Sequence, residues 1–332
     1  MISLKHRKLL VGLLAVFSVL AVWTNRRTST RVQDKVLIVE SGEDELSIET
    51  VDWSRVAYVT YATSSDYLCN AVILTAELRK LTQANIVTLI EANLLDDHVT
   101  SLLTALKQSS TVVEIDSVDE RASDSWDHSF VKLHSFNLTQ FDRIVYLDCD
   151  ALLLKPIDYL FLLPWDHQIF AHAYWTDLQL GSYLMVLSPS THVFNTLWRL
   201  VKNRNKDKNI YDMDILSTVS PSYLYDPSHV GATKKYLLPA YPNIMLTGEL
   251  KTKNHNTFLK SRYASQPLSD WPSMRQNISL VHFSDWPDPK PWVFNNIYDD
   301  LPVCDGLSCS DHQVWISYHQ KYHSLHNKYC PS

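Results

Sequence analysis

The chain of 332 residues contains only six glycines, and they form no glycine-rich loop. P-loop proteins and Rossmann dinucleotide-binding proteins hold phosphates with such loops. The sequence therefore argues against both classes. If the chain binds a nucleotide, we expect a metal ion rather than a glycine loop to hold its phosphates.

Basic charge and paired cysteines are also scarce. The formal net charge is −6 at pH 7, which leaves no basic footprint for nucleic acid. No two cysteines have the Cys-x-x-Cys spacing of a zinc site. Three of the five cysteines lie near the C-terminus, which predicts a disulfide there in an oxidising compartment, with partners left open. Cys149 is expected to be a small buried filler. The cysteines are Cys69, Cys149, Cys304, Cys309 and Cys330.

A long hydrophobic run occurs only at the N-terminus, over residues 9–23, and it is shorter than the roughly 20 residues of an average membrane span. It is either a cleaved signal peptide or an uncleaved signal anchor. Large residues at the end of the run, without a small-residue cleavage site, favour the anchor. We therefore expect a cytosolic tail (1–8), a signal-anchor transmembrane segment (9–23), a stem (24–50) and a lumenal domain (51–332).

Strand and helix patterns alternate through the first half of the lumenal part. We expect strands over 54–63, 85–91, 111–116 and 144–147, with helices over 67–81, 96–109 and 129–141. A further strand and helix are expected over 183–190 and 192–203, and a strand that breaks into a proline-rich loop over 279–292. This alternation predicts an α/β fold with a mostly parallel central sheet flanked by helices. Ligands of such sheets bind outside the carboxyl ends of the strands.

Two aspartates, Asp148 and Asp150, follow the apolar run 144–147 at such a strand end. A solvated loop would explain them, but close carboxylates also suit a divalent cation. His282 ends another apolar run and is followed by Lys290. A metal ligand and a nearby cation could grip a diphosphate from two sides. A core histidine and a surface lysine are the simpler alternative.

The chain resembles the glycogenin-like glycosyltransferases of family eight, which have the GT-A fold. Four stretches follow one another in that family's order: "YVTYATSSDYLCNAVILTAELRK", "KLHSFNLTQFDRIVYLDCDALLLKPIDYLF", "LMVLSPS" and "HFSDWPDPKPW". They cover nearly the whole lumenal part. The forms "YDMDIL", "LTGELK" and "HFSDWPDPKPW" are similar to the fungal N-acetylglucosaminyltransferase subgroup, also called glucose N-acetyltransferases.

This resemblance implies roles for individual residues. Asp148, Asp150 and His282 would bind Mn²⁺ against the donor diphosphate, and Lys290 would pair with the phosphate. The residues implied near the rest of the donor are Tyr61, Thr63, Ser64 and Tyr67 at the uracil and ribose, Lys132 beside the donor, and Ser182 at the sugar.

Two motifs depart from the family. The aspartate of the family's G-D-Q-G motif, close to the anomeric carbon, corresponds to Asp212, but the lost glycines and glutamine leave Asp212 and Asp214 as alternatives. The family's N-S-G reads "GSY" here, so only Ser182 carries over.

The resemblance implies a retaining, UDP-sugar-dependent glycosyltransferase of the Golgi membrane. It would be a single-pass type II protein whose lumenal domain moves N-acetylglucosamine to a glycan acceptor on glycoproteins. The alternatives are a hexosyltransferase of the same family that uses UDP-glucose or UDP-galactose, and a non-catalytic lumenal glycan-binding protein on the same fold. A soluble cytosolic glucosyltransferase is disfavoured by the N-terminal apolar run.

Overall fold

The computed structural model describes the part of the chain that carries most of these predictions. The described residues are 47–92, 99–116, 127–163, 169–173, 180–204, 210–219, 238, 242–250, 276–284, 290–293 and 309–330. The chain divides into two compact units, Met1–Glu40 and Ser41–Ser332. All the described residues belong to the second unit.

Among the helices in these ranges, none combines the length and the apolar character needed to cross a bilayer. The predicted tail (1–8), signal anchor (9–23) and most of the stem (24–50) lie outside the described residues. The division of the N-terminal region therefore stays a prediction.

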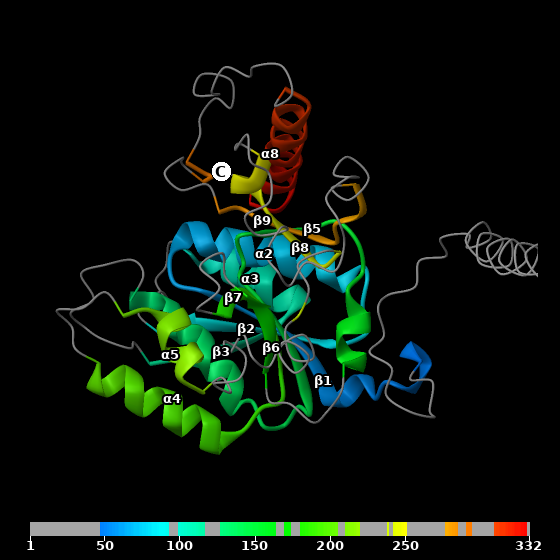
Figure 1. Cartoon of the computed structure of the whole chain (residues 1–332). Helices are drawn as coiled ribbons and strands as arrows, with labels where there is room; N and C mark the ends of the chain where they lie inside the picture. Colours follow the sequence, from blue (N-terminus) through cyan, green and yellow to red (C-terminus); the bar gives the residue numbers. More distant parts are fainter. Residues whose placement is uncertain are drawn as a thin grey trace, which may run out of the picture. The chain divides into compact units, whose positions relative to one another are not determined.

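The main sheet has six strands in the order β3-β2-β1-β4-β7-β6 (Figure 1). Their bounds are β1 Val56–Ala62, β2 Asn85–Glu91, β3 Thr111–Ile115, β4 Arg143–Leu147, β6 Ile169–Ala173 and β7 Leu180–Leu187. Strands β1 to β4 pair in parallel, as the alternating pattern predicts. Strand β7 runs antiparallel to β4, and β6 runs antiparallel to β7. The sheet is therefore mixed rather than mostly parallel beyond β4.

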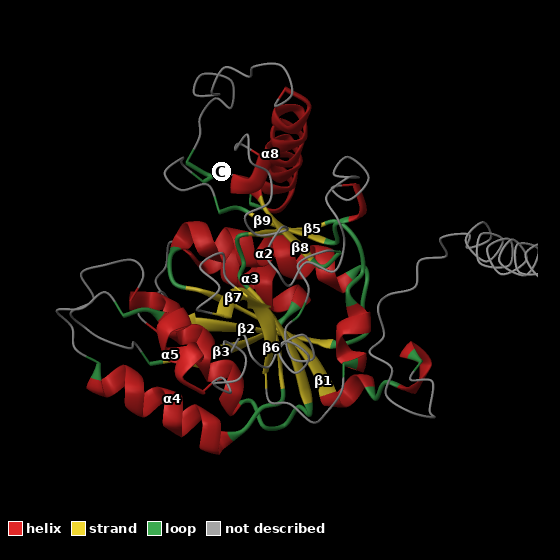
Figure 2. Ribbon diagram, in the orientation of Figure 1, coloured by secondary structure: helices red, strands yellow, loops and turns green. Residues whose placement is uncertain are grey.

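Helical segments cover both faces of this sheet (Figure 2). One face carries α2 Ser65–Arg79 and α3 Thr100–Ser109, and the other carries η5 Asp127–Asn137, α4 Thr191–Asn203 and α5 Asp212–Val219. Strand β1 shows how both faces of the sheet are buried in hydrophobic cores. Tyr58 and Ala62 enter the core under α2, whereas Ala57 and Val59 enter the core under η5 and α4. Alternate residues of a strand point to opposite faces, so a strand buried on both sides is apolar throughout.

The segment before β4 is helical, as expected over 129–141, but its turns are 3₁₀ and the helix (η5) ends at Asn137. Phe130, Leu133 and Phe136 are fully buried, which is a spacing of three residues. A 3₁₀ helix has three residues per turn, so this spacing places the three side chains in one line against the sheet.

A second, smaller sheet brings a late part of the chain next to the end of β4. It contains β5 Ala151–Leu153, β8 Ile244–Leu246 and β9 Leu280–His282, in the order β5-β9-β8. Strands β5 and β9 are antiparallel, with Ala151 opposite His282. The Phe283 N–H also donates to the Asp150 carbonyl at 3.0 Å. This register places His282 beside Asp150.

The last helix, α8 Cys309–Tyr329, packs against α2 and is tied to it covalently. Cys69 of α2 forms a disulfide with Cys330, and the Tyr322 hydroxyl donates to the Asn70 side chain at 2.7 Å. A disulfide near the C-terminus is thus confirmed for Cys330, although its partner lies in α2. Cys304 and the Cys309 side chain are not described. Cys149 is buried and free, as predicted.

Breaking this disulfide is expected to lower the free energy of unfolding by about 2–5 kcal/mol, because the bond closes a very long loop. The separation of the two cysteines is 261 residues. Urea unfolding of Cys330→Ser and of the wild type, each with and without reductant, measures the effect. Reductant should bring the wild type down to the variant and leave the variant unchanged. Equal stability of the two oxidised proteins would contradict the expectation.

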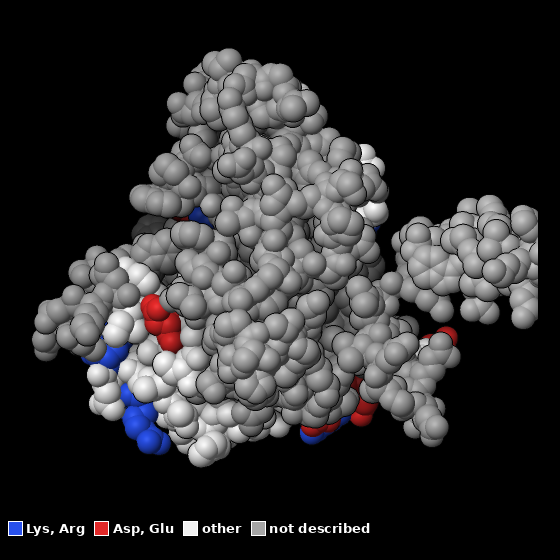
Figure 3. Space-filling model, in the orientation of Figure 1, with Lys and Arg blue, Asp and Glu red and all other residues white. Residues whose placement is uncertain are grey.

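Charge on the described surface is mixed in sign. Arg55 pairs with Asp142, and Lys80 pairs with Glu77. On the face shown in Figure 3, basic side chains lie near α4 with acidic side chains close by. This arrangement is compatible with the prediction of no nucleic-acid partner, which stays a prediction.

Candidate active site

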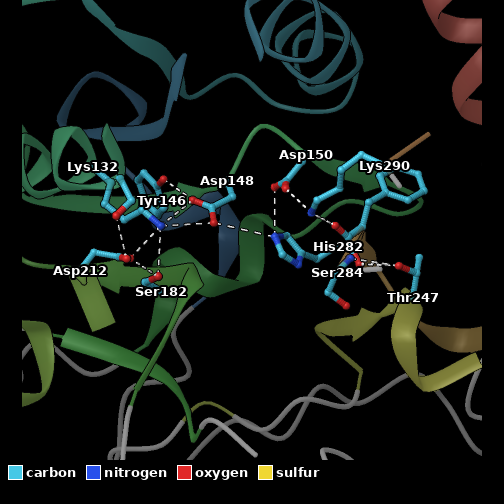
Figure 4. A network of polar contacts seen from close by, with 12 residues as sticks. Lys132, Tyr146, Asp148, Asp150, Ser182, Asp212, Thr247, His282, Ser284 and Lys290 are labelled. Carbon is cyan, nitrogen blue, oxygen red and sulfur yellow. Dashed lines mark hydrogen bonds and ion pairs between the residues drawn. The ribbon is translucent and has the colours of Figure 1, made fainter. Parts of the chain in front are cut away.

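Two aspartates at the end of β4 face a histidine at the end of β9 (Figure 4). Asp148 directly follows β4, and its N–H donates to the Tyr183 carbonyl of β7 at 3.0 Å. Asp150 is buried just before β5. One ligand atom from each of Asp148, Asp150 and His282 lies within 4.8 Å of the other two. The structure therefore brings together the three residues that the resemblance implied as metal ligands.

The geometry of this triad, Asp148, Asp150 and His282, fits one divalent cation. His282 Nε2 lies 3.0 Å from Asp150 Oδ1 and 3.8 Å from Asp148 Oδ2, so one ring nitrogen faces both carboxylates. Hard divalent ions bind carboxylate oxygens, and manganese also accepts imidazole. The described residues contain no other cluster of this kind.

Lys290 adds positive charge beside Asp150. Its Nζ lies 2.9 Å from Asp150 Oδ2, and it also donates to the Phe283 carbonyl. Burial raises the pKa of Asp150, but the charges of His282 and Lys290 outweigh burial and hold that pKa below its usual value. Asp150 is therefore an ionised ligand. The Lys290 side chain is 25% exposed, so its ammonium remains within reach of a ligand.

Lys132 links Asp148 to a third carboxylate, that of Asp212. Its Nζ lies 3.0 Å from Asp148 Oδ1, 2.9 Å from Asp212 Oδ2 and 3.1 Å from Ser182 Oγ. The side chain is only 3% exposed. Burial lowers the pKa of Lys132, but the negative charges of Asp148 and Asp212 outweigh burial and raise that pKa above its usual value. The lysine therefore stays charged. One buried cation thus compensates part of the negative charge of this site.

Asp148 is in a different electrostatic state from Asp150. Burial and the negative charge of Asp150 raise the pKa of Asp148, against the opposing charge of Lys132. The Tyr146 hydroxyl donates to Asp148 Oδ1. A divalent cation in the triad would compete with a proton for this carboxylate.

The structure separates the two alternative aspartates of "YDMD". Asp212 is buried and accepts hydrogen bonds from Ser129 Oγ at 2.9 Å and from Ser182 Oγ. Burial alone would raise its pKa, but Lys132 and these donors hold the pKa below its usual value. Asp214 instead accepts from the Tyr211 N–H at 2.9 Å, at the start of the same helix. Asp212 therefore belongs to the network of Asp148, whereas Asp214 makes a local helix contact.

The four residues implied near uracil and ribose lie around the carboxyl end of β1. The Tyr61 ring lies 5.5 Å below Lys132 Nζ, next to the aspartate network. Ser64 caps α2 by accepting from the Tyr67 N–H at 3.3 Å, which gives its hydroxyl a structural role. Thr63 is half-buried between Tyr61 and this cap.

Tyr67 connects this end of β1 to the Lys290 segment. Its ring meets the Trp292 ring edge-on, with 5.5 Å between centroids. Trp292 also contacts the Tyr322 ring of α8 at 5.8 Å. Trp292 is thus held between the first turn of α2 and the last helix.

Ser129 and Tyr146 are polar neighbours that the sequence reasoning missed. Tyr146 precedes Asp148 by two residues, and side chains two residues apart on a strand share a face. The contact between Tyr146 and Asp148 could therefore have been predicted from the sequence. Ser129 had no such signal, because its hydroxyl reaches Asp212 from a segment whose 3₁₀ geometry was not predicted.

Curated proteins similar to this chain are named as transferases, although no protein-family model matches it. Glucose N-acetyltransferase 1 of Aspergillus fumigatus is 31% identical over 351 residues, which cover 96% of this chain and 85% of that protein. Glucose N-acetyltransferase 1 of Gibberella zeae is 32% identical over 308 residues, which cover 85% of this chain and 64% of that protein.

Solved structures support the fold. The WbbM bifunctional glycosyltransferase matches with a TM-score of 0.52 at 16% identity, over 73% of this chain and 47% of that one. The parallel β3-β2-β1-β4 order with antiparallel β7 and β6 agrees with a GT-A glycosyltransferase. With 31% identity across nearly its whole length to a named transferase, the chain belongs to the glucose N-acetyltransferase 1 family and is a transferase with the GT-A fold.

Proposed function

We propose that the chain is a retaining glycosyltransferase that moves N-acetylglucosamine from UDP-N-acetylglucosamine to a glycan acceptor on glycoproteins, with Mn²⁺ as cofactor. The observation that carries the proposal is the convergence of Asp148, Asp150 and His282 at the carboxyl end of β4. Open α/β sheets bind their ligands at this edge. The names of the relatives support the choice of an N-acetylated sugar.

In this proposal the triad and Lys290 act on the diphosphate of the donor. Bound to the triad, a divalent cation would neutralise the negative charge that grows on the departing diphosphate. Lys290 contributes a fixed positive charge at the same place, because its Nζ already lies 2.9 Å from a ligand oxygen of Asp150. No proton donor to the leaving group is needed where positive charge is supplied in this way.

Asp212 is the carboxylate that we assign to the sugar. The oxygens of Asp212 are fixed by Lys132, Ser182 and Ser129, so the carboxylate is oriented before a substrate binds. Its lowered pKa keeps it ionised. A fixed, ionised carboxylate beside the metal triad can stabilise positive charge on the anomeric carbon. The family resemblance gives retention, and hence an α-linked product.

We further propose that the enzyme is a single-pass type II protein of the Golgi membrane, with the domain 51–332 in the lumen. The N-terminal apolar run 9–23 and the preceding basic residues support this orientation. The Cys69–Cys330 disulfide supports an oxidising compartment, because disulfides persist there and are rare in the cytosol.

A panel of UDP-sugars tests the donor and the metal together. UDP release from UDP-N-acetylglucosamine should exceed release from UDP-glucose and UDP-galactose by about tenfold or more, since a pocket that contacts the N-acetyl group discriminates by at least 1–3 kcal/mol. Chelation should abolish release, and added Mn²⁺ should restore it. Preference for UDP-glucose or UDP-galactose would contradict the proposed donor but would still support a glycosyltransferase. Absence of release from every donor would favour the non-catalytic alternative.

A further inference from the structure

Three aromatic rings from three strands stack beside the metal triad. The Tyr183 ring of β7 stacks with two imidazoles, those of His172 on β6 and of His282 on β9. The centroids of Tyr183 and His282 are 5.0 Å apart with an interplanar angle of 28°, and those of Tyr183 and His172 are 5.9 Å apart at 15°. Tyr183 is 5% exposed. The face of the His282 ring is therefore covered by an almost fully buried aromatic ring.

Tyr183 also contacts the opposite side of the triad through its backbone. Its carbonyl accepts the Asp148 N–H at 3.0 Å, directly after the last ladder pair between β4 and β7. One residue thus fixes the backbone of a carboxylate ligand and the ring of the imidazole ligand. In Figure 4, dashed lines join the His282 imidazole to both aspartates.

Gly181 leaves the space that the Tyr183 ring occupies. A Cβ at position 181 would lie 2.8 Å from two carbons of that ring and from its hydroxyl oxygen, which is closer than a real Cβ approaches another atom. Residues 181 and 183 share a face of the strand, so the ring lies back over the glycine. The "GSY" sequence therefore forms a unit in which the glycine permits the position of the tyrosine.

His282 is the ligand that most needs such a restraint. Its Nε2 faces the carboxylates, whereas its buried Nδ1 has no hydrogen-bond partner in the described residues. Imidazoles that bind metals are ordinarily oriented by a hydrogen bond to the second ring nitrogen. For His282, ring stacking on Tyr183 is the orienting contact that the described residues supply.

We propose that Tyr183 is a positioning residue of the metal site, which acts by holding the His282 imidazole toward Asp148 and Asp150, and that Gly181 is required for this position. The inference rests on the proposed metal triad. It assigns a function to the residues where this chain reads "GSY" instead of the family's N-S-G.

The test measures Mn²⁺ affinity by the electron paramagnetic resonance signal of free Mn²⁺, with the full chain and Mn²⁺ alone as the probe. Tyr183→Leu should weaken Mn²⁺ binding by about tenfold, because an orienting contact of a metal ligand is lost. Tyr183→Phe should stay within about twofold of the wild type, because the stack is retained. Tyr58→Leu is the matched control: Tyr58 is also buried, and its hydroxyl donates to Asp158 rather than to a residue of the triad.

A double-mutant comparison shows whether the effect passes through His282. His282→Ala should weaken Mn²⁺ binding, and adding Tyr183→Leu should weaken it no further, since no imidazole remains to be held. An equal loss from Tyr183→Leu in both backgrounds would overturn the inference. Wild-type Mn²⁺ affinity in Tyr183→Leu, together with weak binding in His282→Ala, would overturn the role of Tyr183 and leave the metal triad standing. Wild-type affinity in His282→Ala would overturn the metal triad itself.

Gly181→Ala provides an independent variant, and its measurement as a single substitution stands even should Tyr183→Leu fail to fold. The added methyl group displaces the Tyr183 ring, so Mn²⁺ affinity should fall by about tenfold. In the Tyr183→Leu background the same glycine substitution should have no further effect on affinity, because the ring that it displaces is gone. Two results would contradict the proposed role of the glycine. One is an equal loss of Mn²⁺ affinity in both backgrounds, and the other is no loss when Gly181→Ala is made in the wild-type protein.

Discussion

Replacing Asp150 by asparagine is expected to lower Mn²⁺-dependent sugar transfer by about a thousandfold, and replacing Asp148 by asparagine is expected to do the same. Loss of a ligand carboxylate removes roughly 4 kcal/mol of charge stabilisation from the departing diphosphate, and each 1.4 kcal/mol is a factor of ten in rate. Asparagine keeps the shape of the side chain. The measurement is UDP release at saturating donor and Mn²⁺.

The structure offers a matched control for these two variants. Asp142 directly precedes β4 at its other end and pairs with Arg55 on the surface, so Asp142→Asn changes one charge next to the same strand without touching the site. It should keep wild-type activity. Thermal unfolding shows whether Asp148→Asn and Asp150→Asn remain folded. A folded Asp150→Asn variant with full Mn²⁺-dependent activity would exclude the proposed mechanism.

Asp212→Asn should lower kcat by about a hundredfold, which corresponds to the loss of one oriented charge in the transition state. The reason lies in the surroundings of the carboxylate. Asp212 is buried and fixed by Lys132, Ser182 and Ser129, and Lys132 joins it to the metal ligand Asp148. Because asparagine preserves the size of the side chain and part of its hydrogen bonding, KM for the donor should change less than kcat.

Asp214→Asn is the paired control for this prediction. Asp214 lies in the same helix two residues later, and its side chain accepts from the Tyr211 N–H at 2.9 Å. We expect kcat of this variant to stay within about a few fold of the wild type, because the cap that Asp214 provides contributes about 1 kcal/mol, and Asp212 is the carboxylate that pairs with Lys132. A larger loss of kcat in Asp214→Asn than in Asp212→Asn would reverse the assignment.

The carboxylate half of the site was predictable from the sequence for a physical reason. The apolar run 144–147 has the length and the β-branched and aromatic content of a buried strand, and Asp148 and Asp150 follow it. Strand ends in a parallel sheet lie at the ligand-binding edge. The position of the two aspartates therefore follows from local sequence and a general rule of the fold.

The histidine half was not predictable in the same way. Strands β5 and β9 are only three residues long, and the pairing of Ala151 with His282 joins segments that are far apart in the chain. Short strands carry almost no periodic signal. His282 was identified from its setting and from the family resemblance, and the small sheet that places it was not predicted.

Side-chain networks and covalent pairing show the same limit. Lys132 was expected near the donor, but its link between Asp148 and Asp212 depends on the 3₁₀ geometry of η5. A disulfide near the C-terminus was expected with its partners left open, and the pairing of Cys330 with Cys69 could not be chosen, because the pairing of cysteines is not encoded locally. Such contacts require the three-dimensional arrangement.

The central claim is that one divalent cation is held jointly by two carboxylates and one imidazole. The most direct test is a crystal structure grown with Mn²⁺ and recorded at a wavelength where manganese scatters anomalously. The account predicts one strong anomalous peak roughly 2.0–2.3 Å from oxygens of Asp148 and Asp150 and from His282 Nε2. A manganese peak that lies elsewhere, or a bound ion that leaves the His282 ring uncoordinated, would contradict it.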